Sequence, residues 1–226
     1  MSIPTSDRLR RAALIAPLLL AGCEGGPDFA AAFGAVTGRQ GVAQVPLFSG
    51  EVQAAGPEGY CIDQQASELS SGFVVLAACP VISSTTTAPR TLGLVTIQFG
   101  EDGTASVTGN EDVLTALLST DAGAALLVSG EGSLRGDVER AIGAVYAYVE
   151  DTAPSPLGAV EAGRWRAFAD VNGRLTTVTA YGLGAAPISE AAKFRLAQRA
   201  VAALQAANPA PQPAAAPLPA AETDPT

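Results

Sequence analysis

An Asn172-Gly173 pair is the feature that most restricts the fold of this 226-residue chain. Both residues accept a positive φ, which the tight turn of a two-residue β-hairpin requires. The segments on either side of the pair, Trp165–Asp170 and Leu175–Tyr181, are the strands that such a turn would join. The sequence therefore predicts an antiparallel hairpin here, and with it a sheet that contains antiparallel strands.

Three more strands are predicted before this hairpin. Phe73–Cys79 is a continuous apolar run that stops at Pro80, which is the pattern of a buried strand. Leu92–Phe99 alternates and is followed by a turn signal rich in glycine and acidic residues. Val138–Val149 is predicted as one strand, with valine and alanine on one face and Tyr146 and Tyr148 on the other.

Two helices are also predicted. Asn110 is the expected cap of the first helix, whose apolar residues at helical spacing are Val113, Leu114, Leu117 and Leu118. Pro187 and Ser189 introduce the second, which runs to Ala207 and is ended by Asn208-Pro209. Its apolar stripe consists of Phe194, Ala197, Val201 and Leu204.

The order of these segments predicts the fold class. Strands follow one another without helical crossovers, which favours an α+β class: a single small domain with a mainly antiparallel sheet and helices on one face. This order loosely resembles the Mog1/PsbP-like fold. The folded domain is expected over residues 45–207, followed by a disordered tail rich in proline and alanine at 208–226.

The composition excludes several classes of function. The net charge is −9, and an acidic surface repels phosphate backbones, so no nucleic-acid partner is expected. The chain contains no histidine. The commonest metal ligand and the commonest general base are therefore absent, and so is every catalytic triad that depends on histidine.

The first 22 residues have the composition of an export signal. Three arginines precede a short apolar run, and Leu20-Ala21-Gly22-Cys23 follows. This order resembles the lipobox of bacterial lipoproteins. The resemblance implies a signal peptide at 1–22, a thioether-linked lipid and further acyl chains such as palmitate on Cys23, and attachment to a membrane. Because Glu24 and not aspartate follows the cysteine, it also implies the outer membrane, facing the periplasm. Residues 23–44 would form the lipidated cysteine and a flexible tether.

Cys61 and Cys79 remain once Cys23 carries a lipid. An even pair of cysteines in an oxidising compartment favours a disulfide. A redox site is the functional alternative, but such sites more often show the Cys-x-x-Cys spacing, and free buried thiols are the remaining alternative.

We find no catalytic motif and predict neither a catalytic residue, a cofactor nor a metal site. Gly130–Gly136 is rich in glycine, but Arg135 stands where a dinucleotide-binding fingerprint needs glycine. Three acidic doublets, at 101–102, 111–112 and 150–151, could supply a glycosidase pair, although solvated or capping roles suit them better. The aromatic residues, with Tyr60 and Trp165 foremost, could line a ligand groove or belong to the core.

Further stretches of the chain, among them Gly59–Ile62 and the Trp165–Leu175 hairpin, look similar to uncharacterised envelope lipoproteins of alphaproteobacteria. We therefore expect a membrane-anchored periplasmic lipoprotein with a non-catalytic binding or scaffolding role and a protein partner in the cell envelope. Two alternatives stay open. One is an envelope glycan hydrolase that uses a pair of carboxylates about 5 to 10 Å apart. The other is a carrier of a small ligand.

Overall fold

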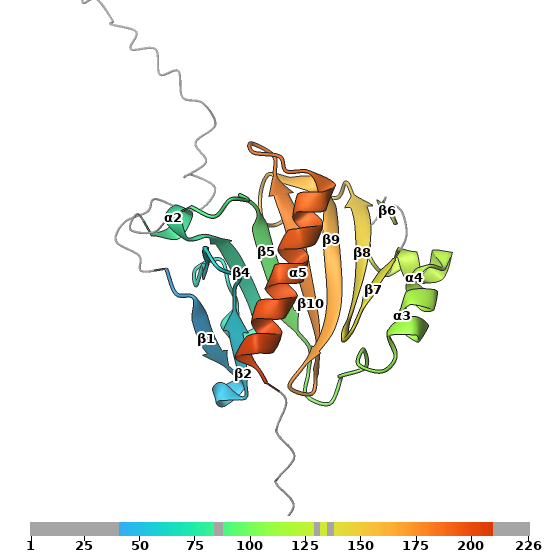
Figure 1. The fold of residues 1–226 in the computed structure, drawn as a ribbon. Coiled ribbons are helices and arrows are strands. Elements are labelled where there is room, and N and C mark those ends of the chain that lie inside the picture. Colours follow the sequence, from blue (N-terminus) through green and yellow to red (C-terminus); the bar gives the residue numbers. More distant parts are fainter. Residues whose placement is uncertain (1–40, 84–87, 129–131, 135–137, 210–226) are drawn as a thin grey trace, which may run out of the picture.

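The computed structural model describes residues 41–83, 88–128, 132–134 and 138–209. The predicted signal peptide, Cys23, most of the predicted tether and residues 210–226 lie outside the described residues. Within them the predicted α+β class is confirmed: a mainly antiparallel sheet is packed against helices in a single small domain (Figure 1).

The main sheet has eight strands in the order β3-β4-β5-β10-β9-β8-β6, and β7 also pairs with β8. All of these pairings are antiparallel. The strands are β3 (Tyr60–Ile62), β4 (Phe73–Ala78), β5 (Leu94–Phe99), β6 (Gly132–Leu134), β7 (Glu139–Ala141), β8 (Ala144–Asp151), β9 (Val160–Val171) and β10 (Arg174–Leu183).

The predicted hairpin is present as β9 and β10, joined by Asn172 and Gly173 with φ of 45° and 80°. The prediction of one strand over 138–149 is wrong. The chain reverses at Ile142-Gly143, where Gly143 has a φ of 70°, and β7 and β8 form a second tight hairpin. Apolar residues and Gly143 run without a break through this turn, from 141 to 145, so the pattern alone did not reveal the reversal.

Helix α5 (Glu190–Ala207) crosses one face of the sheet, over β9 and β10 (Figure 1). The predicted start of this helix is confirmed, because the Ser189 hydroxyl caps it and accepts a hydrogen bond of 3.2 Å from the amide of Ala192. The predicted apolar stripe is buried, with Phe194 partly buried against Tyr146 and Trp165. A small hairpin, β1 (Gln44–Leu47) and β2 (Val52–Ala55), lies beside α5 and extends the same core.

The opposite face is covered in part by two shorter helices, α3 (Glu111–Leu118) and α4 (Asp121–Ala125). The helices therefore divide between the two faces and do not share one face as predicted. The reason is that β8 carries apolar side chains on both sides: Tyr146 faces α5, whereas Val145, Ala147 and Val149 pack with Leu118. Asn110 precedes α3 as predicted, but its side chain donates to the carbonyl of Ser106 and makes no cap hydrogen bond.

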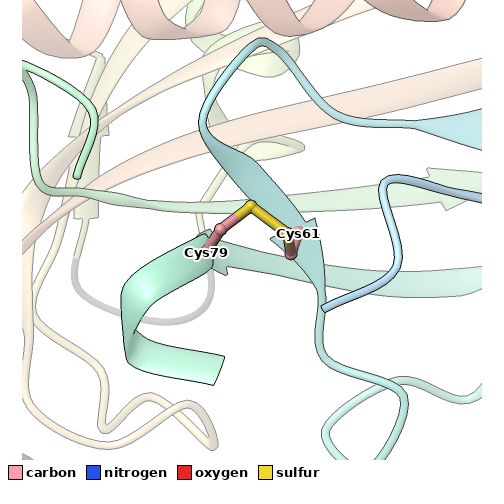
Figure 2. Close-up of a disulfide and its surroundings, with 2 residues drawn as sticks. All are labelled: Cys61 and Cys79. Atoms are coloured by element: carbon pink, nitrogen blue, oxygen red, sulfur yellow. A yellow bond between two sulfur atoms is a disulfide. The ribbon is translucent and has the colours of Figure 1, made fainter. Parts of the chain in front are cut away.

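The predicted disulfide between Cys61 and Cys79 is present (Figure 2). It joins β3 to the first residue of the one-turn helix α2 (Cys79–Ile82), with 4.8 Å between the two Cα atoms. Both cysteines are buried with Val75, Ala77 and Tyr181 on the face opposite α5. Two short 3-10 helices, Phe48–Gly50 and Leu69–Ser71, complete the described elements.

Candidate functional site

Tyr60 and Trp165 lie in the core and not at the wall of a groove. Tyr60 is 1% exposed, and its hydroxyl donates to the carbonyl of Thr91 at 2.8 Å and accepts from the amide of Gly93 at 3.1 Å. Burial raises the pKa of Tyr60 to about 12. The ring of Trp165 is packed between Phe194 and Tyr148. Both aromatic residues therefore hold secondary-structure elements together.

A more informative group of side chains lies on the face of the sheet that α5 leaves uncovered. Alternation along β9 directs Trp165 towards α5 and its neighbours Arg164 and Arg166 to the other side. Cross-strand register places Arg164 beside Tyr181 of β10, and Arg166 between Ala147 of β8 and Thr179 of β10. Ala147 is small, which leaves room for the long side chain of Arg166.

These two arginines line a cavity of about 220 Å³. Its remaining walls come from the strands on either side and from the segment Ala153–Leu157, which follows β8. The lining is completed by Phe73, Thr96, Asp151, Ala153, Pro154, Ser155, Pro156, Leu157 and Tyr181. Apolar clusters around the disulfide and around α3 flank this part of the sheet, so the arginines form a charged strip between two apolar regions.

Arg164 is held in place by a buried ion pair. Its guanidinium donates to a carboxylate oxygen of Asp151, and the two side chains are 8% and 2% exposed. The other carboxylate oxygen of Asp151 accepts a hydrogen bond of 3.0 Å from the amide of Ala153. The Tyr181 ring lies 5.6 Å from the Arg164 guanidinium carbon, within the range of a cation–π contact. Asp151 thus neutralises and orients Arg164.

Arg166 has no such partner among the described residues. Its Nε is buried without a hydrogen bond, and none of the described carboxylates lies within ion-pair distance of its guanidinium. Burial, and then the positive charge of Arg164, lower the pKa of Arg166, although an arginine side chain stays protonated in proteins. The described charges lining the cavity are therefore two guanidiniums and one carboxylate, which leaves one positive charge without a described counterion.

Two other cavities lack this surplus of buried charge. One, of about 500 Å³, lies between α4 and β6 and is lined by small and polar residues with Asp121. The other, of about 390 Å³, lies beside the β7–β8 turn, where Glu111 and Arg140 offset each other. Counting the described lining residues, each of these three cavities contains one acidic side chain, and these residues do not supply the carboxylate pair of a glycosidase.

The acidic doublets have structural roles at several positions. Glu111 accepts a hydrogen bond of 2.9 Å from the amide of Gly143 and thereby ties α3 to the β7–β8 turn. Hydrogen bonds from its own backbone amide and from that of Gly143 lower the pKa of Glu111. Asp112 pairs with Arg140 at 2.8 Å. In the described part of the chain, no group of three or more cysteine, aspartate or glutamate side chains is placed to hold a metal ion.

Sequence reasoning missed Arg164 and Arg166. The signal available was the Arg-Trp-Arg order, which in a strand places both arginines on one face. That order alone suggests a solvated face. The burial of these side chains comes from the segment after β8, whose path over the sheet no local pattern indicates.

Comparisons with known proteins provide no family for this chain. No protein-family model matches it, and no curated protein does. Among solved structures, the Saccharomyces cerevisiae Ran-binding protein Mog1p is similar at 10% identity and a TM-score of 0.41, over 73% of this chain and 92% of that one. A point mutant of Mog1 matches at 10% identity and a TM-score of 0.40, over 73% and 93%. At this level the similarity concerns the arrangement of elements and carries no information on what this chain binds.

Among the described helices, none combines the length and the apolar composition needed to cross a membrane.

Proposed function

We propose that this chain is an envelope lipoprotein, anchored through a lipid on Cys23, whose domain binds an anionic group of another envelope component. The binding role is supported above all by one observation: the guanidinium of Arg166 lies in a cavity beside that of Arg164, and no carboxylate of the described residues pairs with it. A cation that is partly removed from water gains most from an incoming anion, since the anion replaces the lost hydration.

The arrangement favours binding over chemical conversion of the ligand. Among the described residues, Asp151 is the acidic side chain of the cavity, and both of its oxygens accept hydrogen bonds, one from Arg164 and one from the amide of Ala153. A carboxylate engaged in this way positions an arginine and is poorly placed to transfer a proton to a ligand. The two arginines are suited to attracting and orienting an anion.

Photo-crosslinking in intact cells tests the binding role. A photo-reactive residue in place of Pro156, which is exposed at the rim of the cavity, should yield a defined crosslinked product. The same residue in place of Gln198, which is exposed on α5, should not yield that product.

The Arg166→Gln substitution, combined with the probe at Pro156, should abolish the product. Arg195→Gln is the matched control, because it removes the same charge from an exposed position on α5. Identical products at positions 156 and 198, or a product that survives Arg166→Gln, would argue against binding through the cavity.

The proposed anchor rests on Leu20-Ala21-Gly22-Cys23 and the arginine-rich segment before it. Labelling of cells with a palmitate analogue should mark the protein, and Cys23→Ser should abolish the label and leave the precursor unprocessed. Equal labelling and equal membrane association of the Cys23→Ser variant would contradict the anchor without affecting the binding role.

A further inference from the structure

We infer that the ligand group of the arginine cavity is a monocarboxylate attached to an apolar body. This inference rests on the proposed function, since it names the chemistry of the anion that the cavity would bind. It uses the balance of charge inside the cavity, the shape of the donors and the character of the walls.

The charge balance sets the charge of the ligand group. Among the described residues, Arg164, Arg166 and Asp151 are the charged side chains that line the cavity, and together these three leave a single positive charge. One carboxylate neutralises that charge, whereas a phosphate monoester would bring close to two negative charges and leave one of them uncompensated near Asp151. The cavity therefore suits a monoanion better than a dianion.

The donors suit a carboxylate in particular. A guanidinium presents N–H groups in a planar fork that matches the two oxygens of a carboxylate. The Nε of Arg166 is without a hydrogen bond. The Nε of Arg164 is also buried without a hydrogen bond, but the charge of Arg164 is already paired with Asp151. Arg166 therefore carries the charge that is left for the incoming group.

The walls around this group are largely apolar. Pro154, Pro156 and Leu157 come from the segment after β8, and Phe73 and Tyr181 come from the sheet. A ligand that placed its carboxylate on Arg166 would lay its adjoining carbon atoms against these side chains and remove apolar surface from water. At about 220 Å³ the cavity is smaller than the roughly 300 to 1,000 Å³ typical of sites for whole ligands. It therefore fits a short acid or the end of a longer chain.

Two sources could present this chemistry: a free carboxylic acid, or the C-terminal carboxylate of a polypeptide that ends in an apolar residue. Both place one negative charge next to an apolar group. Calorimetric titration of the purified full-length chain separates them. 3-Phenylpropanoate represents the free acid, and N-acetyl-alanyl-phenylalanine represents the polypeptide end. The corresponding amides, 3-phenylpropanamide and N-acetyl-alanyl-phenylalaninamide, have the same bodies without the charge.

We expect at least one of the two acids to bind, with the apparent Kd rising roughly tenfold or more for its amide, because the charged hydrogen bonds to Arg166 are lost. Acetate, which lacks the apolar body, should bind more weakly than 3-phenylpropanoate. Arg166→Gln should weaken binding of the acid by a similar factor, and Arg195→Gln should leave it unchanged. Circular dichroism of each variant establishes that it is folded.

The outcomes separate this inference from the proposed function. Phenyl phosphate binding as tightly as 3-phenylpropanoate, with the same dependence on Arg166, would overturn the carboxylate assignment and keep an anion-binding site. Equal binding of acid and amide, or of acetate and 3-phenylpropanoate, would also overturn the inference. If none of the anions binds to the folded chain, both the inference and binding through the cavity fail.

Discussion

Asn208 and Gln53 are joined by two hydrogen bonds, although 155 positions separate them in the sequence. The Gln53 amide donates to Asn208 Oδ1 and the Asn208 Nδ2 donates to the Gln53 carbonyl, both at 2.8 Å. The same Nδ2 also donates to the carbonyl of Leu204 at 2.8 Å. The side chain of Asn208 thus closes the last turn of α5 and fixes this helix to β2. The folded domain therefore includes Asn208, which the sequence had assigned to the disordered tail.

Replacement of Asn208 with alanine should lower the free energy of unfolding by roughly 1 to 3 kcal/mol, because the backbone groups of Gln53 lose their partners in a partly buried position. Chemical denaturation measures this change. Gln205→Ala, at an exposed position one turn earlier, should shift stability by no more than about 0.5 kcal/mol. Equal effects of the two substitutions would show that the hydrogen bonds to β2 contribute little.

The apolar stripe of α5 should be essential for the domain. Leu204 is 1% exposed, and Leu204→Ala should cost roughly 2 to 5 kcal/mol through the cavity it creates. Truncation before Pro187 should unfold the domain, because it removes the cover from one face of the sheet. Truncation after Pro209 should leave the melting temperature unchanged. A domain that melts at the same temperature without residues 187–226 would contradict this role of α5.

Substitution of the two arginines of the cavity should have different effects on the stability of the fold. Arg164→Gln leaves the buried carboxylate of Asp151 without its partner and should cost roughly 3 to 5 kcal/mol. Arg166→Gln removes a partly buried charge that no described carboxylate pairs with, and should leave the melting temperature unchanged or raise it. Thermal unfolding of the two variants checks this difference. A loss of stability from Arg166→Gln as large as that from Arg164→Gln would indicate that Arg166 supports the fold itself.

The disulfide should stabilise the domain by about 3 kcal/mol, which is the value expected for closing a loop between positions 18 apart. Mass spectrometry without reduction should find one peptide crosslinked through Cys61 and Cys79. A Cys61→Ala, Cys79→Ala double variant should unfold at lower denaturant concentration than the oxidised protein, and reductant should have no further effect on it. Quantitative alkylation of both thiols before reduction would refute the crosslink.

Much of the fold follows from signals that act over a few residues. Asn172-Gly173 specified the β9–β10 hairpin because positive φ is a local property of these two residues. Ser189 and the stripe from Phe194 to Leu204 specified α5 in the same way, since a cap and an amphipathic period need only one helix. The reversal at Gly143 escaped prediction, because an apolar run that continues through a tight turn looks like one longer strand.

The sequence by itself determined the α+β class, the main hairpin, the bounds of α5 and the pairing of Cys61 with Cys79. Only the tertiary structure decided that α3 and α5 cover opposite faces, that Asn208 belongs to the folded domain, and that Arg166 lies in a cavity with no counterion among the described residues. These three features depend on contacts between segments that are distant in the chain. Burial and the pairing of charges are properties of such contacts, and no short stretch of sequence contains both partners.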